Sequence, residues 1–299
     1  ALSLAQAGVI NRSLVDRIVD PSSARGAWAQ GTGASGDVGR SGFATGKYSG
    51  GGAMAGYDWS ASDALTVGAA LDWNKLNSTY TQSAGTSNTR STGLSLYGKY
   101  AFGGGYVAGR VGHDWLKSRV NRWALIGNGY QGIGSERNDA MTSAYIEAGL
   151  SRHAGAWDVQ PYASVGAERL HRAAIREVGA GGFGLTAGAA SINQTAGGLG
   201  LRFSRSWQWS GGTSWFSGYA AWQHVLSGSD LSFKAAYAGA PDATFMVEGA
   251  NSPRGAALFG AGVTTQVSAS WSWFVNVDGL LSGGATKSRE ATVGVRFQM

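Results

Sequence analysis

The sequence predicts an all-β transmembrane barrel of about 12 antiparallel strands, with an N-terminal α-helix in its lumen. Three observations predict this fold. Apolar residues alternate with small or polar residues from near Arg25 to the last residue, which is the period of a β-strand. Short and long breaks between these runs alternate strictly along the chain, as expected of a barrel with short turns at one end and longer loops at the other. The first 20 residues have helical spacing instead.

The helix is predicted in "ALSLAQAGVINRSLVDRIVD", where Ile10, Leu14 and Ile18 recur at helical spacing and Pro21 ends the run. A helix of about 20 residues spans about 30 Å, which is the thickness of the bilayer core. In a barrel with an even number of strands, both chain ends lie on the short-turn side. The helix is therefore expected to run up the lumen and to place Ala1 toward the cell surface. The alternative is a helix outside the barrel or frayed in solvent.

The clearest strand pattern is "ALTVGAALDWNK", in which every second residue is apolar: Leu65, Val67, Ala69, Leu71 and Trp73. The same pattern recurs in "TGLSLYGKY", "TSAYIEAGLS", "GGLGLRF" and "WSWFVNVDG". Tight breaks are expected at 60–63, 103–105, 154–156, 209–212 and 268–270. Longer breaks, rich in Gly or Ser, are expected at 35–43, 81–88, 124–137, 173–190 and 228–254.

The final segment "EATVGVRFQM" carries an apolar face to its last residue, formed by Ala291, Val293, Val295, Phe297 and Met299. Chain ends are usually frayed and polar, so this strand is expected to pair with the first strand and to face lipid. The alternative, a soluble sandwich, would need a charged outward face, whereas the second face here mixes Gly, Ser and Tyr with lone charges. The predicted division of the chain is a pore helix with its linker, 1–21, and a barrel, 22–299.

Composition supports a membrane protein and excludes several other classes. Charged residues make up 14% of the chain, against about 25% in soluble domains, and aromatic residues gather at strand ends. No stretch approaches the roughly 18 apolar residues of a membrane helix. The absence of cysteine excludes a disulfide scaffold. The 24 basic residues are scattered, so no nucleic-acid partner is expected. With no basic segment before "ALSLAQAG", the chain is expected to be a mature or excised piece.

Charged residues at the strand parity opposite to the apolar face are predicted to line the lumen, because a charge facing lipid costs roughly 2–4 kcal/mol near the midplane. These predicted wall residues are Asp58, Asp72, Lys99, Arg110, Glu147, Glu168, Arg202, Asp278 and Arg296. The helix contributes Arg12, Asp16, Arg17 and Asp20. The hypothesis is that Arg12 and Arg17 pair with Glu147, Glu168, Asp72 or Asp278, so that the helix plugs the pore. The alternative is that these charges face water in an open channel.

Motifs of catalysis are weak, and we expect neither an enzyme nor a cofactor. "GTGASG" at 31–36 satisfies the dinucleotide pattern, but it lies in a predicted strand that leads into a loop. The histidines lack ligand spacing: His113, His153, His171 and His224. An outer-membrane enzyme would need clustered carboxylates on the long loops, which carry few acids. A porin or small-solute channel remains the main alternative, although a typical porin would have sixteen or more strands.

Several segments together resemble the translocator domain of bacterial autotransporters, the type V secretion systems of Gram-negative bacteria. They are the initial helix with "RGAWAQGTGASGDV", then "GGGAMAGYDWSASDALTVGAALDW", "GLSLYGKYAFGGGYVAGRVGHD", "VQPYASVGAERL", "GGLGLRFSRSW", "SGYAAWQHVL" and "GAALFGAGVTTQVSASWSWFVNVDG". The closing segment "GGATKSREATVGVRFQM" is similar to the terminal strand of the family. The resemblance covers nearly the whole chain and depends on the order and spacing of these segments.

The resemblance implies a twelve-stranded outer-membrane barrel with a helix through its pore. It also implies secretion and surface anchoring of a passenger that precedes the helix. The expected partners are outer-membrane lipid, the passenger, the β-barrel assembly machinery and periplasmic chaperones. The implied assembly signal is the terminal strand: Val293, Val295, Phe297 and Met299.

Two residues depart from the family pattern. Met299 stands where an aromatic residue is usual. A lone Asn11 stands where self-cleaving members carry paired asparagines, so the passenger is expected to stay attached or to be cut by another protease.

Overall fold

The structure, a computed structural model, describes residues 2–20, 25–39, 45–81, 85–248, 254–282 and 286–298. One α-helix, α1 (Leu2–Val19), precedes the strands. The twelve long strands are β1 (Gly26–Val38), β2 (Gly46–Ser60), β3 (Leu65–Tyr80), β4 (Gly85–Phe102), β5 (Gly105–Ile126), β6 (Gly129–Leu150), β8 (Trp157–Arg172), β11 (Ala190–Trp209), β12 (Gly212–Ser227), β15 (Gly255–Gln266), β16 (Trp271–Ser282) and β17 (Lys287–Phe297). The shorter elements are β7 (Arg152–Ala154), β9 (Ile175–Arg176), η1 (Gly181–Phe183), β10 (Leu185–Ala187), β13 (Phe233–Tyr237) and β14 (Ala240–Val247).

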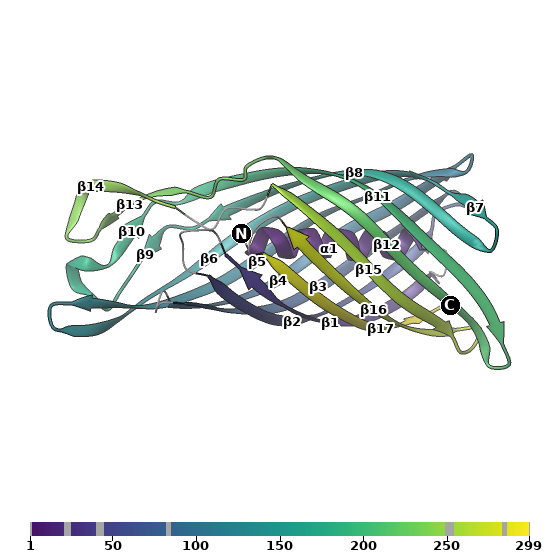
Figure 1. The fold of residues 1–299 in the computed structure, drawn as a ribbon, viewed down its shortest axis with the longest axis horizontal. Helices are drawn as coiled ribbons and strands as arrows, with labels where there is room; N and C mark the ends of the chain where they lie inside the picture. The colour runs from purple at the N-terminus through teal and green to yellow at the C-terminus, as the bar shows by residue number, and fades with distance from the viewer. Residues whose placement is uncertain are drawn as a thin grey trace.

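The long strands form a closed antiparallel barrel (Figure 1). Neighbouring strands in the chain pair with one another, and the last strand, β17, pairs with the first, β1, from Ala27 opposite Phe297 to Asp37 opposite Lys287. This confirms the predicted twelve-stranded barrel and its closure by the terminal strand. The glycine-rich segment 31–36 lies within β1 and is paired on both sides, so it is not the turn before a helix that a dinucleotide site requires.

Side chains alternate between the lumen and the outer surface along each long strand. On β4, Ser91 and Ser95 are buried, whereas Leu94 and Leu96 are exposed on the outside. A continuous apolar outer surface would be unfavourable in water, so it requires an apolar surrounding. The barrel therefore has the lipid-facing exterior that the period-two pattern predicted.

The helix lies inside the barrel, with its axis along the barrel axis (Figure 1). It begins toward the end of the barrel that carries β13 and β14 and ends toward the short turns, where β1 begins. Among the described residues, no helix is long and apolar enough to cross a membrane. The predicted boundary at residue 21 falls in 21–24, which lie outside the described residues.

The long breaks are more ordered than the sequence predicted. Instead of a loop at 124–137, β5 and β6 each run for 22 residues and are joined by the two-residue turn 127–128, where Gly127 has a φ of +61°. The breaks at 173–190 and 228–254 contain β9, β10, β13 and β14, which form a separate four-stranded sheet. An ion pair of 2.6 Å between Arg122 and Glu177 joins the β5–β6 hairpin to the first of these segments. Long-range pairing therefore overrides the local preference of the glycines for a loop.

Candidate functional site

The apolar face of α1 packs against one side of the lumen. Ile10, Leu14, Val15, Ile18 and Val19 are at most 4% exposed. They form one cluster with inward residues of β1 to β5, which are Trp28, Met54, Ala70, Tyr97, Tyr106 and Ala108. The strand pattern predicted a polar bore and did not indicate this apolar surface, although its residues occupy the predicted inward parity. Because full burial of such a side chain stabilises by about 1.5–3 kcal/mol, this contact supplies most of the attraction between helix and wall.

Arg17 and Asp58 form a buried ion pair near the end of the helix. The Arg17 Nη2 atom lies 2.6 Å from Asp58 Oδ2, and both side chains are 3% exposed. The Arg17 guanidinium also lies 4.6 Å from the ring centroid of Trp28. Trp28 Nε1 and the Tyr97 hydroxyl both donate to Asp58 Oδ1. The carboxylate of Asp58 is thus fixed from three directions, as a buried charge requires.

Arg202 of β11 connects the helix to the opposite side of the lumen. Its guanidinium lies 2.5 Å from Asp16 Oδ1 on the helix and 2.5 Å from Glu147 Oε1 on β6. It also donates to the Tyr106 hydroxyl at 3.0 Å and stacks 3.9 Å from the ring centroid of Tyr162. One cation therefore satisfies a helix carboxylate and a wall carboxylate that has no exposed side-chain surface.

A third polar cluster surrounds Asn11, which is 1% exposed. Arg110 donates from Nη1 to Asn11 Oδ1 and to Ser143 Oγ, and from Nε to Ser95 Oγ at 3.1 Å. Asn11 Nδ2 donates to Glu168 Oε1 at 3.4 Å. In the sequence, Asn11 was notable only because it stands where self-cleaving members carry paired asparagines. In the structure, its amide bridges a cation and a carboxylate of the wall.

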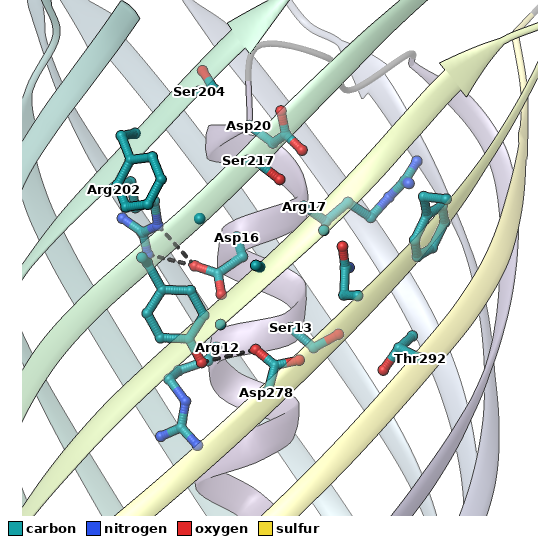
Figure 2. Close-up of a pocket in the computed structure, with 18 of the residues that line it drawn as sticks. Arg12, Ser13, Asp16, Arg17, Asp20, Arg202, Ser204, Ser217, Asp278 and Thr292 are labelled. Carbon is teal, nitrogen blue, oxygen red and sulfur yellow. Dashed lines mark hydrogen bonds and ion pairs between the residues drawn. The ribbon is translucent and has the colours of Figure 1, made fainter.

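The remaining side of the helix faces a cavity of about 120 Å³ that many charged and polar side chains line (Figure 2). Arg12, Asp16 and Asp20 line it from the helix, and Asp278, which accepts a 2.9 Å hydrogen bond from Tyr219, lines it from the wall. Small residues of β12 and β15 leave the space open: Gly218, Gly260, Ala261 and Gly262. Among the residues that the structure describes, Arg12 forms no ion pair.

The nine predicted wall charges all have the inward parity, but most of the predicted partners differ. Arg17 pairs with Asp58, whereas Glu147, Glu168, Asp72 and Asp278 bond to Arg202, Asn11, Asn74 and Tyr219, respectively. Lys99 and Arg296 lie within electrostatic reach of Asp20 at the end of the helix. The strand pattern could not give these partners, because they depend on how the helix is rotated in the lumen.

Asp114 of β5 is a buried carboxylate that is absent from the predicted wall charges, although it has the inward parity of Arg110. It is 1% exposed, and neither of its oxygens has a hydrogen-bond partner. Asp72 lies two strands away at the same level, because both residues are in register with Gly93. A Cβ atom on Gly93 would lie 2.4 Å from an oxygen of each aspartate, so the two carboxylates converge above the glycine.

The outward residues of the terminal strand are Val293 and Val295, which are exposed on the barrel surface. Phe297 packs against Trp271, with ring centroids 4.9 Å apart. Met299 lies outside the described residues. In the described part of the chain, no group of three or more His, Asp or Glu side chains could hold a metal ion.

The comparison with protein families identifies one family. The family described as "Autotransporter beta-domain" matches residues 27–278. No curated protein has a detectably similar sequence. Three autotransporter domains are among the solved structures with a similar fold.

The translocator domain of the autotransporter NalP from Neisseria meningitidis is 16% identical with a TM-score of 0.78, and the alignment covers 100% of this chain and 98% of that one. The beta domain of the Bordetella autotransporter BrkA is 18% identical with a TM-score of 0.65, covering 92% and 100%. The transport unit of AIDA-I from Escherichia coli is 13% identical with a TM-score of 0.60, covering 99% and 98%.

At these identities the three structures support the fold, while the family match covers most of the chain. The porin or small-solute channel that the sequence left open is not favoured, because the family and these three folds are autotransporter domains. Membership also supports a transport barrel of the bacterial outer membrane rather than an enzyme. The chain belongs to the autotransporter beta-domain family.

Proposed function

We propose that this barrel carries a passenger segment preceding α1 across the outer membrane and then holds it at the cell surface, with the helix closing the lumen. The observation that supports this proposal best is the position of the helix. The helix begins toward the long-connection end of the lumen, ends toward the short-turn end and is followed in the chain by β1 (Figure 1). A segment attached before the helix would therefore leave the barrel at the long-connection end.

In this proposal the long-connection end faces the outside of the cell and the short turns face the periplasm. The helix acts as a plug because its apolar face is packed on β1 to β5 and its charges are paired to β2 and β11. Assembly would require the β-barrel assembly machinery and periplasmic chaperones. The outward apolar residues Val293, Val295 and Phe297 with Met299 would form the signal for that assembly.

The passenger is proposed to remain attached or to be released by a separate protease. Asn11 is engaged on both sides of its amide, by Arg110 and Glu168, and the residue after it is Arg12 rather than a second asparagine. This arrangement supports a structural role for Asn11 in holding the helix.

Orientation is tested with an epitope tag joined before Ala1 in cells that express the chain. We expect added protease to remove the tag from intact cells, because the start of the helix lies at the outward end. The matched control is the same tag inserted between Gly103 and Gly104 in the short turn between β4 and β5, which should be protected until the outer membrane is permeabilised. If the first tag were protected in intact cells and the second were cleaved, the proposed orientation would be contradicted.

The plug is tested by single-channel conductance in planar bilayers. Deletion of residues 1–20 should open the lumen and raise conductance well above that of the whole chain. Unchanged conductance after deletion, in a barrel that still shows heat-modifiable migration, would contradict the plug.

A further inference from the structure

Three basic residues form a row across neighbouring strands on the outer surface of the barrel. Lys75 on β3 lies directly opposite Arg90 on β4, and Arg90 lies directly opposite Lys117 on β5. Their side chains point away from the lumen, because the next residue on β4, Ser91, is buried inside. Directly opposed residues have Cβ atoms only about 4.5–5.5 Å apart. Three positive charges are therefore held side by side on a rigid sheet.

Protein carboxylates compensate this row only at one end. Glu136 on β6 lies 2.6 Å from Lys117 Nζ and 2.8 Å from Arg119 Nε. Within the described part of the chain, neither Lys75 nor Arg90 forms an ion pair. Like charges placed directly opposite each other destabilise an antiparallel pair, so the row is expected to be used with an anion that the protein does not supply.

The level of the row on the barrel indicates what that anion is. A second row lies two positions along each strand toward the short-turn end. In it, Trp73 lies opposite Thr92, and Thr92 lies opposite Trp115. Both tryptophans are at least half exposed on the outside. Exposed tryptophans of membrane barrels lie at the boundary between hydrocarbon and head groups. The basic row therefore lies at the head-group level on the long-connection side of that boundary.

We propose that Lys75, Arg90 and Lys117 bind the phosphate groups of lipid head groups. A guanidinium can bind two phosphate oxygens at once, and the flanking ammonium groups add point charges. This inference relies on the proposed function only in taking the barrel to span a membrane. The phosphate is assigned to a lipid rather than to a free ion because the row lies at the head-group level, next to the exposed Trp73 and Trp115.

The test uses the whole chain in detergent micelles, with native mass spectrometry to count bound lipid during titration with bis-phosphorylated lipid A. A basic residue near an anionic surface contributes about 1 kcal/mol, so Lys75→Gln with Arg90→Gln should raise the half-saturating lipid concentration about 25-fold. Lipid A with both phosphates removed should bind the unaltered chain about as weakly. That second comparison leaves the protein intact and holds even if the double variant fails to fold.

The matched control is Lys287→Gln with Arg289→Gln, which removes the same two charge types from β17. Lys287 lies opposite Asp37, so its charge already has an acidic neighbour. This control should stay within about twofold of the unaltered chain. The proposal is overturned if both pairs lose affinity equally, if neither does, or if millimolar pyrophosphate displaces the lipid completely. None of these readouts depends on passenger export, so a failure here is distinct from a failure of the tag experiment.

Discussion

Replacement of Arg202 by methionine should release the helix from the lumen wall. Arg202 is the shared cation of Asp16 on the helix and Glu147 on the wall. Once it is removed, Glu147 keeps hydrogen bonds from the hydroxyls of Tyr106 at 2.7 Å and Tyr145 at 2.9 Å but has no cation. The docked helix keeps water away from this carboxylate, which is 1% exposed. The lost partner therefore destabilises the docked state more than an undocked state in which the lumen fills with water.

The magnitude follows from the burial of each partner. Removing one member of a buried pair costs about 3–5 kcal/mol, and the two tyrosine donors favour the lower value for Glu147. A loss of about 3 kcal/mol lowers the ratio of docked to undocked helix by a factor of about 100. Asp16 is 33% exposed, so Asp16→Asn, which leaves the Arg202–Glu147 pair intact, should cost less than about 1 kcal/mol.

The assay uses the absence of cysteine from the chain. Val15 has no exposed surface, so a Val15→Cys thiol should react with maleimide only when the helix leaves the wall. We expect Arg202→Met to raise the labelling rate about 100-fold, and a second change, Glu147→Gln, to restore most of the protection. Equal labelling with and without Arg202, or no recovery with Glu147→Gln, would refute the assignment of Arg202 as the cation that retains the helix.

Three further changes test other contacts. Asp114→Asn should raise the temperature of the heat-modifiable gel shift, because it removes a buried charge without hydrogen-bond partners; a lower temperature would contradict this. Leu14→Ala should increase single-channel conductance, because a cavity at this fully buried position weakens docking by about 2–5 kcal/mol; unchanged conductance would show that this contact does not hold the helix. Gly26→Ala should lower the temperature of the gel shift. Gly26 has a φ of +126°, and an added Cβ atom would lie 2.2 Å from the Phe297 carbonyl oxygen, where β1 and β17 close the barrel. An unchanged temperature would show that the β1–β17 pairing adjusts to the methyl group.

The strand arrangement could be predicted because each strand carries its own orientation signal. In "TGLSLYGKY", the outward positions Leu94 and Leu96 are apolar and the inward position Ser95 is polar, so a single strand shows which face meets lipid. The same parity places Asp114 and Glu290 in the lumen, although the sequence analysis named neither. Closure also follows locally, since an apolar edge at the end of the chain needs a partner strand.

The contacts of the helix could not be predicted in the same way. Trp28 and Met54 are inward but apolar, and a rule that assigns apolar residues to lipid gives no reason to expect them to bind a helix. Their role depends on the rotation of α1, which is set by contacts between segments far apart in the chain. The β5–β6 hairpin was missed for a similar reason. Its glycines favour a loop locally, whereas the ion pair of Arg122 with Glu177 and the buried Ile133 favour paired strands.

The two kinds of helix contact have different consequences for how α1 is held. Apolar packing against β1 to β5 is strong but non-directional, so it would also allow a helix that is rolled or shifted by one turn. The ion pairs lie on different sides of the lumen, with Asp58 on β2 for Arg17 and Arg202 on β11 for the adjacent Asp16. Two neighbouring helix residues can reach both partners in only one rotation and at one height. The apolar face therefore provides most of the affinity, and the paired charges select the position of the helix. The cavity beside β12 and β15 lies on the side where the helix is packed least closely against the wall.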